Sequence, residues 1–139
     1  MNGLQALAER YLDSWNQTDE HRRREHFADV FTPDVTYVDP LRSLVGYDAL
    51  SDEIAAVYEA FPRLTFRLGS AVDGHHGIAR FTWHFGAPDA EPLVIGFDVV
   101  IIENERIRTV YGFIDRAPAH AVPEELIREG AILVGALRA

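Results

Sequence analysis

The sequence predicts an α+β domain, a cone-shaped α+β barrel in which N-terminal helices pack inside a curved antiparallel sheet. Apolar residues recur at helical spacing up to Phe61, and from Leu64 onward the apolar period becomes two. Helices that precede an antiparallel series of strands are typical of this class. The 139 residues are enough for one core, so we expect residues 1–139 to form a single domain.

Three helices are expected in the N-terminal part of the chain. The first carries one apolar face, from Leu4 to Trp15, on an otherwise polar segment. The second ends at Thr32-Pro33-Asp34, and the third ends at Pro62. The expected helical ranges are 4–15, 21–31 and 46–59.

Five strands are expected. A β-branched and aromatic segment at 35–38 is predicted to stop at Asp39, because a residue before proline is extended and Pro40 cannot donate to a ladder. The remaining four have alternating patterns bounded by turn residues. Their expected ranges are 64–72, 78–85, 93–103 and 106–114.

The last segment, residues 118–139, is predicted to form a C-terminal helical tail. Pro123 is followed by Glu124 and Glu125, which is a favourable start for a helix. We expect this tail to pack against the domain or against a partner subunit.

The composition favours a small hydrophobic molecule as partner. The net charge of -9, from 13 basic and 22 acidic residues, and the scattered arginines argue against nucleic-acid binding. Cysteine is absent, which excludes disulfides and thiolate metal sites and favours a cytoplasmic location. No signal-peptide pattern and no apolar run near the ~20 residues of a membrane helix is visible, so we expect a soluble protein without membrane contact.

Asp98 is the most informative residue, because it lies inside the ten-residue run 93–102 that has no other charge. Burying a carboxylate without a partner is costly, so Asp98 needs a partner or a proton. Two interpretations follow. Asp98 is either half of a buried structural ion pair or a catalytic or ligand-contacting carboxyl.

Tyr11 and Asp39 are further candidates for a site. Tyr11 lies in the buried stripe of its helix, so its hydroxyl must find an internal polar partner. Asp39 follows Tyr37 by two residues, hence on the same strand face, at a strand end that can reach the mouth of the cone. The alternatives are a core tyrosine and a turn residue before Pro40.

Five segments, in this order of elements, carry a family resemblance. They are Ala8–Tyr11, Phe31–Pro40, Ile54–Tyr58, Phe97–Val100 and Arg106–Val110. Over about residues 4 to 116 the chain resembles the nuclear transport factor 2-like superfamily, in particular its SnoaL-like and ketosteroid-isomerase branches. This fold hosts enzymes, binding modules and transport adaptors, so the resemblance alone does not name a reaction.

The resemblance to ketosteroid isomerase implies roles for four residues. Asp39 takes the general-base position, Tyr11 and Asp98 take the two oxyanion-donor positions, and Tyr58 supports Tyr11. One departure concerns the last strand, where Ile114 replaces a tryptophan of the isomerase.

The strand at 78–85 departs from the resemblance to ketosteroid isomerase, because Arg80, Thr82 and His84 stand at positions that are apolar in the isomerase. If His84 pairs with Val94 in the next strand, Arg80 lies opposite Asp98, close enough to pair. An arginine there would favour an ionised carboxylate, which cannot donate to an oxyanion.

The expected site contains three catalytic candidates and seven further pocket candidates, and no metal or cofactor is expected. The histidines lack ligand-like spacing, and no phosphate-binding glycine loop is present. The catalytic candidates are Tyr11, Asp39 and Asp98, and the further pocket candidates are Trp15, Tyr37, Tyr58, Arg80, Thr82, His84 and Phe113.

Three functions remain open at this point. The first is cofactor-independent proton transfer on a small hydrophobic carbonyl compound, ketosteroid-isomerase-like or polyketide-cyclase-like, with Asp39 as base. The second is an epoxide-hydrolase-like reaction in which Arg80 and Asp98 orient water. The third is a noncatalytic ligand-binding or interaction domain. A homodimer is expected, because the outer face of the sheet needs cover.

Overall fold

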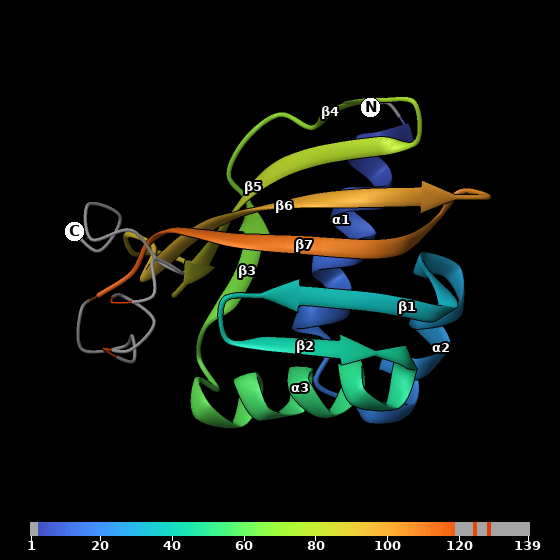
Figure 1. Cartoon of the computed structure of the whole chain (residues 1–139). Helices are drawn as coiled ribbons and strands as arrows, with labels where there is room; N and C mark the ends of the chain where they lie inside the picture. Colours follow the sequence, from blue (N-terminus) through green and yellow to red (C-terminus); the bar gives the residue numbers. More distant parts are fainter. Residues whose placement is uncertain (1–2, 119–123, 125–127, 129–139) are drawn as a thin grey trace.

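The computed structural model describes residues 3–118, 124 and 128 and confirms the α+β class (Figure 1). None of the described helices has the length and apolar character needed to cross a membrane. The elements are α1 (Gly3–Asn16), α2 (Glu20–Val30), β1 (Phe31–Asp39), β2 (Arg42–Val45), α3 (Gly46–Ala60), β3 (Thr65–Leu68), β4 (Asp73–His75), β5 (Ile78–Gly86), β6 (Val94–Glu103) and β7 (Arg106–Arg116).

The strands form one curved sheet with the order β2-β1-β7-β6-β5-β3, and β4 pairs with β5. Strands β5, β6 and β7 form the expected antiparallel meander. Strand β1 pairs with β7 in parallel, so the sheet is mixed rather than wholly antiparallel. Figure 1 shows α1 crossing behind the strands and α3 lying beside the β2 edge. The inner face of the sheet therefore faces α1.

The core lies between α1 and the sheet. The apolar stripe of α1 is buried, and the ring of Tyr11 makes edge contacts with Phe31 and Phe81 at centroid distances of 5.8 and 5.7 Å. Asn16, at the end of the helix, exchanges two hydrogen bonds of 2.8 Å with the backbone of Phe66 in β3. Since α1 is fixed at its end and along its face, the position of Tyr11 relative to the sheet is fixed too.

Three features of the fold differ from the expectations. Strands β2 and β4 were not predicted, and the expected strand 64–72 is shortened to β3 (Thr65–Leu68). Strand β1 starts at Phe31, because the register shift between Phe31 and Thr36 takes Pro33 out of the ladder, where it could not donate. The predicted tail, apart from Pro118, Glu124 and Arg128, lies outside the described residues.

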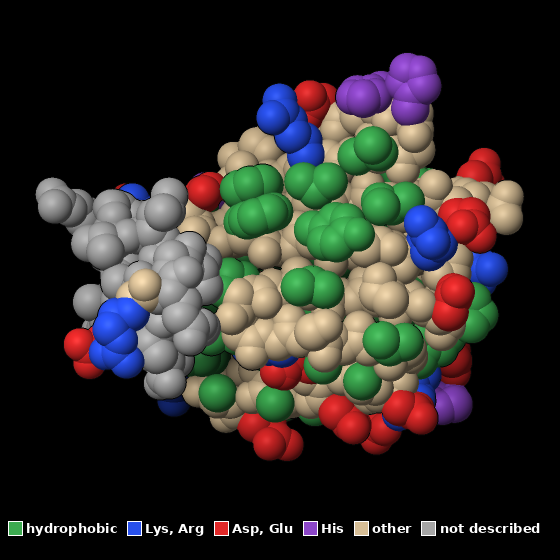
Figure 2. All heavy atoms as spheres, in the orientation of Figure 1, with side chains coloured by type: hydrophobic (Ala, Val, Ile, Leu, Met, Phe, Trp, Pro, Cys, Tyr) green, Lys and Arg blue, Asp and Glu red, His purple; other side chains and the backbone are tan. Residues whose placement is uncertain are grey.

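The outer face of the sheet exposes apolar side chains. Phe97 and Phe113 stack across β6 and β7 with their centroids 4.8 Å apart, and Tyr111 and Val38 lie on the same face with 43% and 39% of their surface exposed. Figure 2 looks onto this face and shows hydrophobic side chains gathered over the central strands. We propose that a second copy of the chain covers it, since an isologous contact would bring the same aromatic residues together across a two-fold axis.

The dimer proposal predicts that Tyr111→Glu gives monomers, because a charge would be buried in the apolar contact. Sedimentation should show about twice 15.6 kDa for the unmodified chain and 15.6 kDa for the variant. Tyr58→Glu is the matched control, since Tyr58 is 41% exposed but lies on α3. A 15.6 kDa species alone for the unmodified chain at micromolar concentration would contradict the proposal.

Candidate functional site

A cavity of about 160 Å³ lies between the inner face of the sheet and helices α1 and α3. Its walls are mainly aromatic and aliphatic side chains from α1, α3, β3 and β5–β7. Its polar lining groups are Tyr11, Tyr37, Asp39, Arg42 and Asp98. The three residues expected to be catalytic, Tyr11, Asp39 and Asp98, are therefore brought to one cavity.

Asp98 lies at the inner face of β6 with 2% of its surface exposed. The indole Nε1 of Trp83 donates to its Oδ1 over 3.1 Å. Burial raises the pKa of Asp98 to about 7, while hydrogen bonding from Trp83 and Tyr11 acts in the opposite direction and the charge of Asp39 adds to the rise. Near neutral pH a large share of Asp98 is therefore a neutral carboxylic acid that can donate a hydrogen bond.

Tyr11 is a second neutral donor beside Asp98. It is 2% exposed, and burial, followed by the charge of Asp98, raises its pKa well above the ordinary value of 10.0. The phenol therefore keeps its proton at physiological pH. Together the two groups can offer two O–H donors to a ligand oxygen.

Asp39 lies at the end of β1 and accepts four hydrogen bonds. Its Oδ1 accepts from the backbone N–H groups of Leu41 and Arg42 at 2.8 and 3.0 Å. Its Oδ2 accepts from the Tyr37 hydroxyl at 2.7 Å and from Arg42 Nη1 at 2.9 Å. Asp39 is thus both a turn residue, which closes the β1–β2 hairpin, and a cavity residue. The two sequence interpretations are compatible.

Arg42 and Glu53 were not singled out from the sequence. The Nε of Arg42 forms a 2.9 Å ion pair with Glu53 of α3, while its Nη1 holds Asp39. The arginine therefore ties the mouth of the cavity to α3. The available signal was an arginine three residues after Asp39, which a tight turn returns to the aspartate.

The other pocket candidates separate into two groups. Trp15 and Tyr37 line the cavity, and Phe113 contributes to its lining although its ring stacks on Phe97 at the outer face of the sheet. Four others do not. Tyr58 is 41% exposed on α3, while Arg80, Thr82 and His84 lie at alternate positions of β5 from the cavity residues Trp83 and Phe85.

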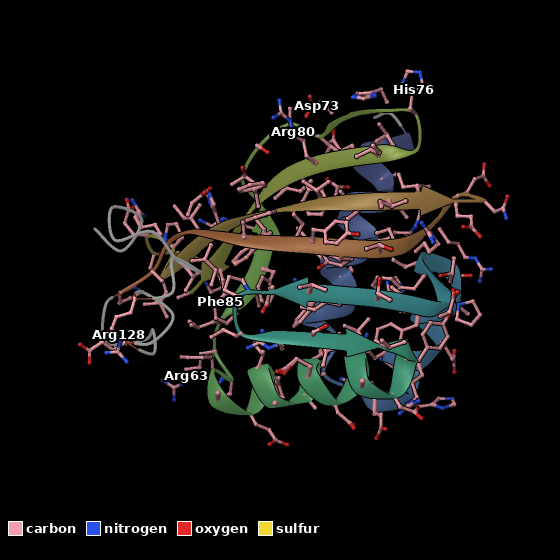
Figure 3. The ribbon with its side chains drawn as sticks, in the orientation of Figure 1. Arg63, Asp73, His76, Arg80, Phe85 and Arg128 are labelled. Atoms are coloured by element: carbon pink, nitrogen blue, oxygen red, sulfur yellow. The ribbon has the colours of Figure 1, made fainter. Side chains whose placement is uncertain are left out.

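The expected pairing of Arg80 with Asp98 is wrong. Arg80 lies opposite Val99, and Phe81 lies opposite Asp98. Arg80 instead forms a 2.9 Å ion pair with Asp73 of β4 at the surface (Figure 3). The epoxide-hydrolase-like arrangement, which required this pair, is therefore absent.

The error is a register slip of one residue. Strand β5 continues to Gly86, so Phe85 rather than His84 pairs with Val94, and the backbone N–H of Leu93 bonds to the carbonyl of Phe85 at 2.8 Å. A slip of one residue moves every side chain to the other face. The signal that could have corrected it is Gly96, which lies opposite Trp83. A Cβ at Gly96 would lie 2.3 Å from the indole ring, so only glycine leaves room there.

Within residues 3–118, 124 and 128, no group of three or more His, Asp or Glu side chains is arranged to hold a metal ion. His75 and His76 contact each other through Nδ1 atoms 3.0 Å apart at an exposed turn. The polar lining groups of the cavity can take part in hydrogen bonding and proton transfer.

Arg80→Met should leave the urea midpoint of unfolding nearly unchanged. The pair with Asp73 is solvent-exposed, at 71% and 68% of the side-chain surface, and exposed pairs contribute little. A buried partner of Asp98 would instead leave a stranded charge on removal. A large loss of stability in this variant would contradict the described register.

Asp98→Asn should become more stable than the unmodified chain as pH rises. Because the pKa of Asp98 is raised from 3.8 to about 7, the folded state binds more protons than the unfolded state between these values. Stability from this group is therefore lost as pH increases through that window. The difference in unfolding free energy between variant and unmodified chain should shift by roughly 4 kcal/mol in the variant's favour from pH 4 to pH 8. Urea unfolding across pH measures this, and a constant difference would show that Asp98 ionises normally.

The chain matches known proteins over most of its length. A SnoaL-like domain matches residues 8–110. A solved structure from Agrobacterium tumefaciens, proposed to be an isomerase of the SnoaL-like family, is 35% identical, covers 83% of this chain and 99% of its own, and superposes with a TM-score of 0.77.

Two other solved structures share the fold at lower identity, and no functionally curated protein matches the chain. A proposed ketosteroid isomerase from Kribbella flavida is 18% identical, with a TM-score of 0.61 and coverage of 87% of this chain and 88% of its own. A proposed SnoaL-like polyketide cyclase from Jannaschia is 14% identical, with a TM-score of 0.64 and coverage of 81% and 85%. The family match and the 35% identity show that this chain belongs to the SnoaL-like family.

Proposed function

We propose that the protein is a cofactor-independent proton-transfer enzyme acting on a small hydrophobic carbonyl compound, in the manner of a ketosteroid isomerase or polyketide cyclase. One observation carries the proposal. A single cavity holds two neutral oxygen acids, Tyr11 and Asp98, together with the carboxylate of Asp39. Two carboxyl groups in different environments are a recurring arrangement for acid–base catalysis.

In the proposed reaction, Asp39 removes a proton from the carbon next to the carbonyl group. The electron pair moves onto the carbonyl oxygen, which becomes an enolate stabilised by hydrogen bonds from Tyr11 and Asp98. The proton then returns to carbon, at the same or a conjugated position, and Asp39 is regenerated. Each step moves one proton, so no oxidant or cofactor enters.

Oδ2 is the proposed proton acceptor of Asp39. The donors to Oδ1 are backbone N–H groups of the turn and cannot leave without opening the hairpin. The donors to Oδ2 are the side chains of Tyr37 and Arg42, which can turn aside. A substrate proton would therefore replace one of these two side-chain donors.

The size of the cavity supports a substrate with a single ring. The volume of about 160 Å³ is close to that of an engineered apolar cavity of about 150 Å³ that binds benzene. Pockets for drug-sized ligands are larger, at about 300 Å³ or more. A four-ring steroid would exceed this space, whereas a cyclohexenone-sized compound would fill it.

The relatives and the composition agree with this proposal. The 35% identical structure is proposed to be an isomerase, which is the class of reaction assigned here. The absence of cysteine fits a reducing, cytoplasmic location, which we include in the proposal. A ligand-binding role without turnover is the outcome that the following experiment separates from catalysis.

Asp39→Asn should lower the rate of proton exchange by roughly 100-fold or more, because the amide keeps the shape but cannot accept the proton. The assay is deuterium incorporation next to the carbonyl of cyclohexanone or cyclohexenone in D₂O, followed by NMR. Asp34→Asn is the control, since Asp34 is an exposed residue of the same strand. Equal rates for Asp39→Asn and the unmodified chain would exclude Asp39 as the base. Saturable binding of these ketones with no exchange above buffer would indicate a binding protein.

A further inference from the structure

We propose that Trp83 is a positioning residue, which fixes the acidic proton of Asp98 on Oδ2 and so presents a single O–H donor to the ligand. The use of this donor in catalysis rests on the proposed function. The hydrogen bond itself and the proton position do not, and they can be measured without a substrate.

The geometry comes from two neighbouring strands. Trp83 pairs with Gly96, and Asp98 pairs with Phe81, so Trp83 and Asp98 are diagonal neighbours on the inner face of the sheet. Diagonal pairs lie within reach of a long aromatic side chain. The indole Nε1 reaches Oδ1 of Asp98 at 3.1 Å, and both residues line the cavity.

The chemistry of the two groups decides where the proton lies. An indole N–H only donates, so the atom that it meets must accept. A protonated carboxyl has one carbonyl oxygen, which is the better acceptor, and one hydroxyl oxygen. Since Oδ1 receives the Trp83 hydrogen bond, Oδ1 is the carbonyl oxygen and Oδ2 carries the proton. Without Trp83, Oδ1 would lose its indole donor, and Tyr11 would be the remaining side-chain donor to Asp98.

Two glycines hold this arrangement in place. A Cβ at Gly96 would lie 2.3 Å from Cζ2 of Trp83, and a Cβ at Gly112 would lie 3.0 Å from Oδ1 of Asp98. The indole therefore lies flat over β6, and the carboxyl lies against β7. Phe66 packs on Trp83 from β3 with a centroid distance of 5.5 Å. The ring is enclosed by strands on both sides, which favours one orientation.

The surroundings of Asp98 contain few competing groups. Tyr11 faces it from α1, Tyr37 and Asp39 act on it from β1, and β7 contributes the backbone at Gly112. Arg42, whose charge acts on Tyr37, is engaged by Asp39 and Glu53. Trp83 is thus the donor with a direct, well-formed hydrogen bond to Oδ1.

The first test uses the unmodified chain. The sequence contains two tryptophans, so its spectrum has two indole N–H signals. The Trp83 signal should move with pH at the same midpoint as the Asp98 carboxyl carbon, because the N–H bond strengthens when Oδ1 becomes charged. The Trp15 signal is the comparison and should move less, since Trp15 acts on Tyr11 rather than directly on Asp98. A Trp83 signal that does not move while Asp98 titrates would overturn the proposal.

The second test compares Trp83→Phe with Trp15→Phe, two indole-to-phenyl changes in the same cavity. Because the Trp83 hydrogen bond lowers the pKa of Asp98, its loss should reduce the acid dissociation constant of Asp98 roughly tenfold. Trp15→Phe should leave this constant nearly unchanged. An Asp98 titration identical in Trp83→Phe and the unmodified chain would also overturn the proposal.

The third test measures binding of phenol at pH 6, where the hydroxyl oxygen of phenol can accept from Asp98. Trp83→Phe should weaken this binding about twofold relative to Trp15→Phe, since the Asp98 proton is then shared between two oxygens and only one of them faces the ligand. Equal affinity in both variants would contradict the positioning role. If the titrations behave as expected but no ketone exchanges its protons, the role of Trp83 stands and the proposed function fails.

Discussion

The buried carboxyl of Asp98 is the constraint on which the rest of the cavity depends. A carboxylate at this position, with 2% exposure and no cation acting on it within residues 3–118, would be costly. Burial raises the pKa of Asp98 to about 7, so the group keeps a proton over much of the neutral range. Trp83 and Tyr11 also donate hydrogen bonds to it. These side chains come from β5 and α1. One polar group therefore couples the helix and the sheet on opposite sides of the cavity.

The same constraint separates the roles of the two aspartates. Asp39 is surrounded by four donors, one of them the Arg42 guanidinium, whereas the donors to Asp98 among the described residues are the neutral side chains of Trp83 and Tyr11. A charged acceptor and a neutral donor can therefore coexist at one pH within a single cavity. Arg42 also divides its hydrogen bonds between Asp39 and Glu53, so the ion pair at the cavity mouth is partly compensated before any ligand arrives.

The spacing of apolar residues and the turn residues between segments were sufficient to predict the fold class, the three helices and the β5–β7 meander. These features depend on which face each residue buries. The family positions led to Tyr11, Asp39 and Asp98, which do line one cavity. Register was not predictable in the same way. The two alignments of β5 on β6 that place Arg80 or Phe81 opposite Asp98 differ by a shift of one residue. Both satisfied the local pattern. The steric demand of Trp83 against Gly96 helps to distinguish them, and it becomes visible when the two strands are placed side by side.

Ile114 of the last strand stands where the isomerase has a tryptophan, yet an indole from β5 donates to Asp98. Residues on different strands can reach the same point in space when the sheet curves around it. Comparing residue types position by position along the last strand therefore misses the donor. Two glycines mark where these side chains lie. Gly96 provides the room that Trp83 occupies, and Gly112 provides the room that the Asp98 carboxyl occupies. In a curved sheet of this kind, a glycine opposite an aromatic residue marks where a side chain crosses its neighbour, and the polar atom beyond that crossing is where a partner should be sought.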